Sequence, residues 1–234
     1  MSTFPPFFIF RLRYEAKKFP DGKFVLEPEL LGPDYEIPAL WRFAPLSARH
    51  FSGQNKPQDD QTGGEVTPDF HFRFAWREDG VLLTLLLQGK KCPVQVNSNK
   101  YDTSDSFSLF LDTRDVRDLH RSTKFCHRLL FLPAPESGEN PSALWLPIHR
   151  AKAHPNPVDI TRFQLAFDRT PESWRLSAFI PGDTLTGYEP LEHSRLGISF
   201  SLFDNEFGWI SQQLPDFFPV AEDPSLWASL DLVE

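Results

Sequence analysis

The chain has 234 residues, enough to bury a hydrophobic core in one large β-domain or two small ones. Its 22 Pro interrupt short apolar runs, which predicts strands and loops and excludes long helices. The net charge of -8 argues against a nucleic-acid partner, because binding to a phosphate backbone depends on cationic neutralisation.

No apolar run approaches the length of a membrane span, and the apolar start of the chain lacks a basic leader and a small-residue cleavage site. We therefore predict a cytoplasmic protein with no membrane partner, and we interpret Phe7–Tyr14 as a strand. The two cysteines, Cys92 and Cys126, do not imply a disulfide framework, and whether they pair stays open.

The rest of the first 68 residues carries turn and loop signals. Asp21-Gly22 is a hairpin signal between Phe19 and the short run Lys23–Leu26. We expect Ile37–Pro45 to be an irregular segment packed on the core, and the polar stretch His50–Pro68 to be a mobile loop.

The next two segments predict a β-hairpin. Asp69–Trp76 alternates between apolar and polar residues, and Val81–Leu87 returns after the turn Glu78-Asp79-Gly80 as a strongly apolar strand. Four aromatic residues share one face of the first strand and are expected in the core: Phe70, Phe72, Phe74 and Trp76.

The stretch Asp105–Leu132 reads as two strands joined by a charged connector, Thr113–Lys124. In Asp105–Asp112, alternation places Phe107, Leu109 and Leu111 on one face and Ser106, Ser108 and Phe110 on the other. The run Phe125–Leu132 is apolar on both faces except at His127 and Arg128, which predicts a central strand.

Further strands are expected at Ala143–His149, Phe163–Asp168, Trp174–Ile180, Leu196–Asp204 and Trp227–Val233, with one helical turn at Pro181–Leu185. About ten short strands with almost no helical periodicity predict an all-β fold, a two-sheet antiparallel β-sandwich with few short helical turns. We expect one domain over residues 1–234, in which residues 1–68 pack on a core formed by residues 69–234.

The order of these segments resembles that of family 9 carbohydrate-binding modules and their DOMON-like relatives. The matching segments are Phe74-Ala75-Trp76 with Asp79-Gly80-Val81-Leu82, Asp105–Asp112, Trp174–Pro181, Leu196–Phe200 ending at Asp204, and Asp223-Pro224. The resemblance implies a jelly-roll-like sandwich, often with structural calcium, and a non-catalytic role in binding a ligand, typically a sugar.

Members of that family hold a saccharide between two Trp rings, one just before the Asp-Ser of the segment that matches Asp105–Asp112 and one just before the final Asp-Pro. Here those places hold Tyr101-Asp102 and Val220-Ala221-Glu222. Ser108 stands where the family has an acidic residue inside the segment that matches Asp105–Asp112. Arg128 stands where the family places a ligand-facing Arg, and Tyr101 is a candidate to replace one of the two aromatic platforms, whereas no residue is a candidate for the other. A haem-binding branch uses Met and His ligands, and the initiator is the only Met, which excludes Met ligation here.

Two groups of residues suggest metal chemistry, each beside a simpler interpretation. His120, His127, His149 and Cys126 offer imidazole and thiolate ligands for a transition metal, or are ordinary sheet and loop residues. Asp112, Asp115 and Asp118 are weak candidates for calcium, or form an ion-paired loop with Arg114 and Arg117.

We predict a non-catalytic module that binds a small polar or anionic ligand, with a saccharide as one candidate. Its expected ligand-binding residues are Tyr101, Ser108, Arg114, His120, His127, Arg128 and His149. No nucleophile elbow, zinc-protease signature or phosphate loop predicts an enzyme. The alternatives are a structural or protein-interaction domain that pairs through the edge Phe4–Tyr14, and a metal-dependent enzyme.

Overall fold

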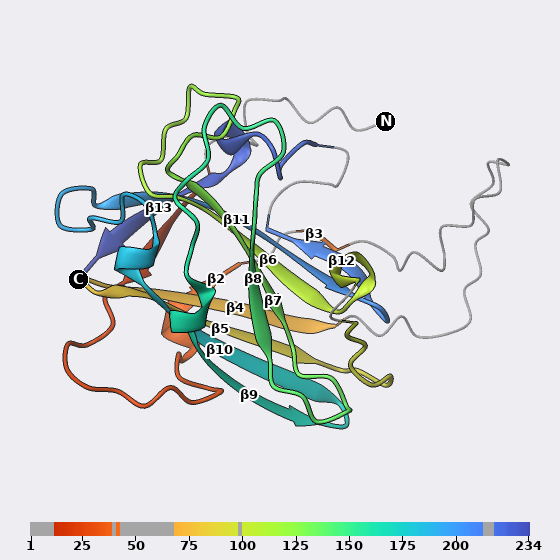
Figure 1. Cartoon of the computed structure of the whole chain (residues 1–234). Helices are drawn as coiled ribbons and strands as arrows, with labels where there is room; N and C mark the ends of the chain where they lie inside the picture. The colour runs from red at the N-terminus through yellow and green to blue at the C-terminus, as the bar shows by residue number, and fades with distance from the viewer. Residues whose placement is uncertain (1–11, 39–40, 43–67, 98–99, 213–217) are drawn as a thin grey trace, which may run out of the picture.

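The computed structural model describes residues 12–38, 41–42, 68–97, 100–212 and 218–234. Over these residues the chain folds into two packed β-sheets, one of eight strands and one of five (Figure 1). The helical elements of this part are 3₁₀ turns: η2 (Pro33–Tyr35), η4 (Tyr101–Thr103), η5 (Ile160–Arg162), η6 (Gly182–Thr184) and η7 (Pro224–Leu226). Within the same ranges, no helix is long and apolar enough to cross a bilayer. The predicted all-β sandwich is confirmed.

The larger sheet has the strand order β1-β13-β11-β6-β7-β8, and β12 joins it by pairing with β11 and β3. Its strands are β1 (Arg13–Lys17), β3 (Trp41–Arg42), β6 (Ser106–Asp112), β7 (Cys126–Leu132), β8 (Ser142–Leu146), β11 (Arg195–Asp204), β12 (Gly208–Ser211) and β13 (Ala228–Val233). Strand β7 lies between β6 and β8, which confirms the prediction of a central strand.

The smaller sheet has the strand order β2-β4-β5-β10-β9. Its strands are β2 (Glu36–Ile37), β4 (Asp69–Arg77), β5 (Gly80–Gln88), β9 (Gln164–Thr170) and β10 (Ser173–Pro181). The predicted hairpin is confirmed as β4 and β5, in which Arg77 pairs with Gly80. A Cβ atom at Gly80 would lie 2.3 Å from the carbonyl oxygen of Ile180, so this tight turn requires glycine.

The two sheets bury their facing sides against each other. The ring of Phe72 in the smaller sheet lies 4.4 Å from that of Phe200 and 5.1 Å from that of Phe107 in the larger sheet, between centroids. All the residues predicted to face inward from β4 and β6 belong to this core. Full burial of each such side chain stabilises the fold by roughly 1.5–3 kcal/mol.

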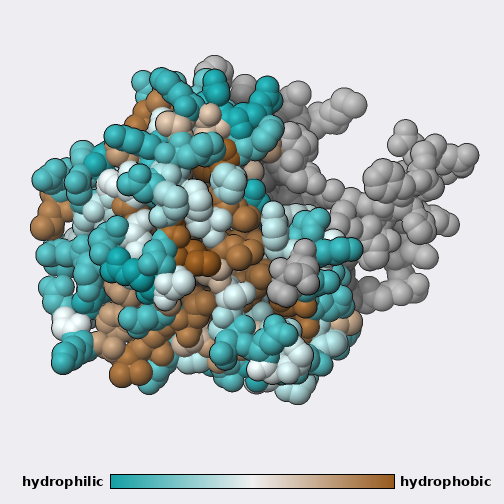
Figure 2. All heavy atoms as spheres, in the orientation of Figure 1, coloured by the Kyte–Doolittle hydropathy of each residue, from teal (hydrophilic) through white to brown (hydrophobic). Residues whose placement is uncertain are grey.

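The sandwich is more open at one side, where the edge strands β8 and β9 bound the two sheets. Trp145, Phe163, Leu165 and Phe167 pack against the core there but are only half-buried. Figure 2 shows hydrophobic residues gathered in the middle of the face seen in Figure 1, within a largely hydrophilic surface.

The N-terminal predictions needed correction. Strand β1 runs over Arg13–Lys17 and pairs in parallel with β13, so it overlaps the predicted Phe7–Tyr14 only at its end, and residues 1–11 lie outside the described part. The hairpin predicted around Asp21-Gly22 is wrong. Residues 19–35 instead cover the outer face of the smaller sheet, where Phe24 packs on Phe179 at 5.5 Å, because that face carries apolar residues of its own.

Three smaller outcomes concern loops and cysteines. Of the predicted irregular segment Ile37–Pro45, the described residues contribute to the short strands β2 and β3, and residues 50–67 of the predicted mobile loop are outside the described ranges. Cys92 is exposed and Cys126 is buried, and both are free thiols, so the two do not pair.

Candidate functional site

Alternation along neighbouring strands directs one row of side chains to the outer face of the larger sheet. The register aligns Ser199 of β11, Phe110 of β6, Arg128 of β7 and Leu146 of β8. Ser108 lies in the next row of the same face, between Ser201 and Leu130, and is 6% exposed. The outer face therefore carries two of the predicted ligand-binding residues, Ser108 and Arg128.

Arg128 is the charged centre of this face. Its guanidinium lies over the Phe110 ring, 5.6 Å from the centroid, and the side chain is half-buried. The Nε atom is buried and makes no hydrogen bond. Desolvation lowers the pKa of Arg128, and the nearby Tyr101 opposes that shift. A desolvated donor without a partner is unfavourable for the isolated protein and suits a ligand that accepts hydrogen bonds.

Tyr101 supplies an aromatic ring beside this centre. It begins η4, is 40% exposed, and its carbonyl accepts a hydrogen bond from the Ser104 N–H at 3.3 Å. The neighbouring Asp105 is fully buried and accepts hydrogen bonds from the backbone N–H groups of Gln95 and Asn205, at 3.0 and 2.7 Å. These bonds fix the segment from which Tyr101 projects.

The segment before η7 closes the other end of the face. Val220 and Ala221 pack on a small cluster formed by Phe110, Cys126, Ile148 and Trp227. The indole Nε1 of Trp227 donates to the Val220 carbonyl at 2.7 Å, and its ring lies 5.6 Å from that of Phe110. Contacts thus join Val220, Phe110 and Arg128, and Tyr101 lies close enough to Arg128 to interact with it electrostatically.

The same segment forms one wall of a cavity of about 520 Å³, lined by His120, Arg121, Arg150, Pro219, Glu222 and Asp223. His120 Nδ1 lies 3.0 Å from Asp223 Oδ2, and His149 Nδ1 lies 3.0 Å from Glu222 Oε1. Two predicted site residues, His120 and His149, therefore each pair with one of two consecutive carboxylates from a distant part of the chain. We call this space the His120 cavity.

Arg150 gives the His120 cavity a defined shape. It is one of two described residues other than glycine with a positive φ, at 58°. This left-handed backbone directs its carbonyl to Nε of Arg121, at 2.8 Å, and its Nη1 lies 4.0 Å from Glu222. Such a conformation is costly for a residue with a Cβ atom and is common at functional sites.

The structure does not bring Arg114 or His127 to the outer face, which corrects the prediction of one shared rim. Arg114 bonds the Gly187 carbonyl and lies 2.6 Å from Glu189, with its guanidinium 4.7 Å from the Phe125 centroid. His127 shares the inward face with Leu129, because alternation that sends Arg128 outward sends its neighbour inward. It is 0% exposed, its Nε2 lies 3.4 Å from the Thr186 carbonyl, and burial lowers its pKa to about 4.

The carboxylates suggested for calcium have other partners. Asp112 accepts backbone hydrogen bonds from Arg114 and Val116, and Asp115 pairs with Arg117 at 3.2 Å and Arg195 at 2.7 Å. Asp118 is exposed. Calcium needs several oxygens converging on one point, and this arrangement does not fit it. The ion-paired loop agrees better with these contacts.

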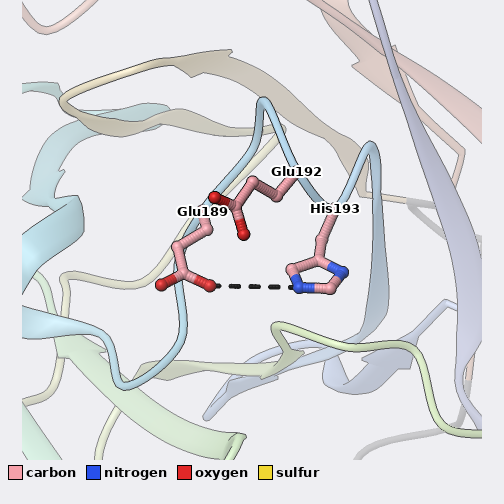
Figure 3. Close-up of side chains that lie close together, drawn as sticks. All are labelled: Glu189, Glu192 and His193. Atoms are coloured by element: carbon pink, nitrogen blue, oxygen red, sulfur yellow. Dashed lines mark ion pairs between the residues drawn. The ribbon is translucent and has the colours of Figure 1, made fainter.

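The groups suggested for a transition metal are also separated. Cys126 lies on the outer face and His127 on the inner face, and burial raises the pKa of the Cys126 thiol to about 12. Glu189, Glu192 and His193 form a different exposed group, with ligand atoms within 4.8 Å of one another (Figure 3). Glu189 already pairs with Arg114, and no further observation indicates a metal there.

Sequence reasoning missed the acidic wall of the His120 cavity. In the sequence, Glu222 falls in the place of a family Trp and Asp223 in a matched segment, and neither position predicts a cavity wall. Its contact with His120 spans 103 positions of sequence, so no local pattern indicates it.

Comparison with known proteins gives structural neighbours. No family model matches the chain, and no curated protein matches it. A family 9 carbohydrate-binding module from Caldicellulosiruptor kristjanssonii in complex with cellotriose is similar, with a TM-score of 0.62 and 14% identity over 94% of this chain and 93% of that one. A family 9 module from the same organism in complex with glucose has a TM-score of 0.55 and 15% identity over 95% of both chains. The chain therefore has the β-sandwich fold of family 9 modules, as the resemblance implied, and the DOMON-like relationship stays a prediction.

Proposed function

We propose that this protein is a non-catalytic saccharide-binding module whose ligand lies on the outer face of the larger sheet, against Tyr101 and Arg128. The observation that carries the proposal is the guanidinium of Arg128, desolvated and with its Nε unbonded, beside an exposed aromatic ring. The two structural neighbours were solved with cellotriose and with glucose, which supports a saccharide as ligand class.

The chemistry of the two side chains suits a sugar. The apolar face of a pyranose packs on an aromatic ring, and its hydroxyl groups accept hydrogen bonds from a guanidinium. The guanidinium of Arg128 packs over the Phe110 ring, and Ser108 lies in the next row of the same face. Few polar groups on an apolar floor are typical of small-molecule sites.

The His120 cavity extends this surface for a longer ligand. Its lining combines two arginines with two carboxylates, so donors and acceptors face one space. Hydroxyl groups both donate and accept hydrogen bonds, and such a mixed lining suits further sugar units. The segment Pro219–Asp223 contributes to the cavity wall and to the cover of Phe110, which makes the two regions contiguous.

Isothermal titration calorimetry of a saccharide panel that includes glucose and cellotriose tests the proposal. At least one saccharide is expected to bind the wild type, and Tyr101→Ala and Arg128→Met are each expected to weaken binding by about tenfold or more. Absence of binding to every saccharide, or wild-type affinity in both variants, would contradict it.

Arg175→Met is the matched control. Arg175 lies on β10 in the other sheet, is half-buried, and also has a buried Nε without a hydrogen bond, but its Nη1 pairs with Glu29 at 2.7 Å. This variant is expected to bind saccharide like the wild type. A loss of affinity equal to that of Arg128→Met would indicate a general effect on stability.

A further inference from the structure

Arg128 differs from the other arginines that the sandwich partly or fully buries. In the described part of the chain, each of the other five with a described side chain has a carboxylate partner: Arg73 with Glu36, Arg77 with Asp79, Arg114 with Glu189, Arg117 with Asp115 and Arg175 with Glu29. Arg128 forms no ion pair with any residue of the described part; its guanidinium lies over the Phe110 ring and interacts electrostatically with Tyr101. No described carboxylate compensates its positive charge.

On the surrounding face, none of the residues that the structure describes forms an ion pair with Arg128. The residues beside Arg128 in its row are Phe110 and Leu146, and the next row on one side holds Ser108, Leu130 and Leu144. The next row on the other side holds Asp112 and Cys126, but the Asp112 carboxylate accepts backbone hydrogen bonds from Arg114 and Val116 and forms no ion pair with Arg128. A half-buried charge with no partner destabilises the free protein, because solvation is lost and no Coulomb attraction replaces it. A bound anion would remove this penalty.

The geometry of a guanidinium defines the anion. Arginine presents a planar fork of N–H donors that binds a carboxylate or another oxyanion through two parallel hydrogen bonds. The exposed Tyr101 near Arg128 is suited to a sugar ring and offers little to a bare inorganic ion. The two features together indicate a ligand with both a ring and an anionic group.

We propose that the ligand of this site is an acidic saccharide, in which a uronate carboxylate or a sulfate ester pairs with Arg128 while a sugar ring lies against Tyr101. This inference rests on the proposed saccharide-binding function and adds the charge of the ligand. Arg128 is then the residue that determines specificity, because it pairs directly with the anionic group of the ligand.

The test compares glucose, glucuronate and glucose 6-sulfate by calorimetry near neutral pH, at low and at high salt. We expect at least one of the two anionic sugars to bind about tenfold or more tightly than glucose, with the preference reduced by salt. Preference for glucuronate or for the sulfate identifies which anionic group the site takes. Equal binding of all three sugars would overturn the charge inference while leaving saccharide binding intact, and absence of binding by all three, and by cellotriose, would overturn both.

Two variants at Arg128 separate charge from geometry. Arg128→Met is expected to abolish the preference for the anionic sugar, and Arg128→Lys to retain part of it, since lysine keeps the charge but not the fork. Arg175→Met is expected to retain all of it. A preference that survives in Arg128→Met, with the fold verified by circular dichroism, would overturn the assignment of Arg128.

Discussion

The ammonium of Lys90 lies 2.5 Å from Oδ2 of Asp204, and the side chains are 3% and 0% exposed. Asp105 lies 3.5 Å from the same ammonium and is also 0% exposed. Asp105 lies between η4 and β6, and Asp204 ends β11, so one buried cation joins the Tyr101 segment to the end of β11. The ammonium neutralises one of two buried carboxylates, and backbone N–H groups bond the remaining oxygens.

Replacing Lys90 with Met is expected to lower the free energy of unfolding by roughly 3–5 kcal/mol, because it leaves two buried carboxylates without their cation. Urea unfolding near neutral pH measures the change. Lys18→Met is the control, since the partners Glu78 and Glu234 are 54% and 84% exposed, and a loss of less than about 1 kcal/mol is expected there. If Lys90→Met lowers the free energy of unfolding no more than Lys18→Met does, the buried pair of Lys90 and Asp204 does not stabilise the fold.

Burial of His127 predicts a pH dependence of stability. Its pKa in the folded protein is about 4, against 6.5 for an unperturbed His, so between these values the unfolded chain binds more protons. Stability therefore falls as the pH decreases from 6.5 to about 4, by about 3 kcal/mol for this group. His127→Gln, which cannot titrate, is expected to remove that part of the slope in urea unfolding at a series of pH values. Parallel slopes for both proteins would contradict it.

Arg114 is expected to contribute to stability and not to ligand affinity. Its guanidinium bonds the Gly187 carbonyl and Glu189 and packs on Phe125, away from Arg128. Arg114→Met is expected to lower the free energy of unfolding by roughly 1–3 kcal/mol while saccharide affinity stays at the wild-type value. Arg162→Met, which removes an exposed pair with Asp183 at 2.9 Å, should change stability by less than about 1 kcal/mol. Loss of affinity in Arg114→Met at unchanged stability would restore its predicted role as a ligand contact.

Trp227 is expected to fix the position of the segment around Val220, which packs on Phe110 beside the proposed site. Trp227→Phe removes the hydrogen bond to Val220, and we expect faster amide hydrogen exchange in residues 218–226 with roughly 1–3 kcal/mol lower stability. Trp174→Phe is the matched control, because that indole is equally buried but its Nε1 makes no hydrogen bond. Faster exchange of residues 218–226 in both variants would mean that the hydrogen bond has no specific effect.

Much of the fold follows from two-residue periodicity. Strands β4, β5, β6, β7 and β10 lie where alternation or continuous apolar runs predicted them, because a pleated strand with one buried face leaves this pattern in the sequence. The turn signal at Asp21-Gly22 failed, since a local signal does not reveal that Phe24 is needed to cover Phe179 in the other part of the chain. Tertiary packing decided the structure there.

For the candidate site, strand alternation predicts which way the side chains on β6 and β7 point, but not which loops come together. The alternation that places Leu129 in the core also places His127 there, so the inward direction of His127 follows from the sequence and is incompatible with its predicted role as a ligand contact on the outer face. The outward direction of Phe110 and Arg128 follows from the same rule. The pairing of His120 with Asp223 could not be predicted, because it depends on how two loops meet across the fold.

The most direct measurement of the central claim is the side-chain Nε–Hε resonance of Arg128 during a titration of ¹⁵N-labelled protein with glucuronate. Because Nε of Arg128 makes no hydrogen bond in the free protein, a ligand that accepts one is expected to shift this resonance in a saturable way. The Nε–Hε resonance of Arg175, on the other sheet, is expected to stay in place. If the Arg128 resonance does not move while the sugar binds elsewhere on the protein, the outer face of β6 and β7 is not the ligand site.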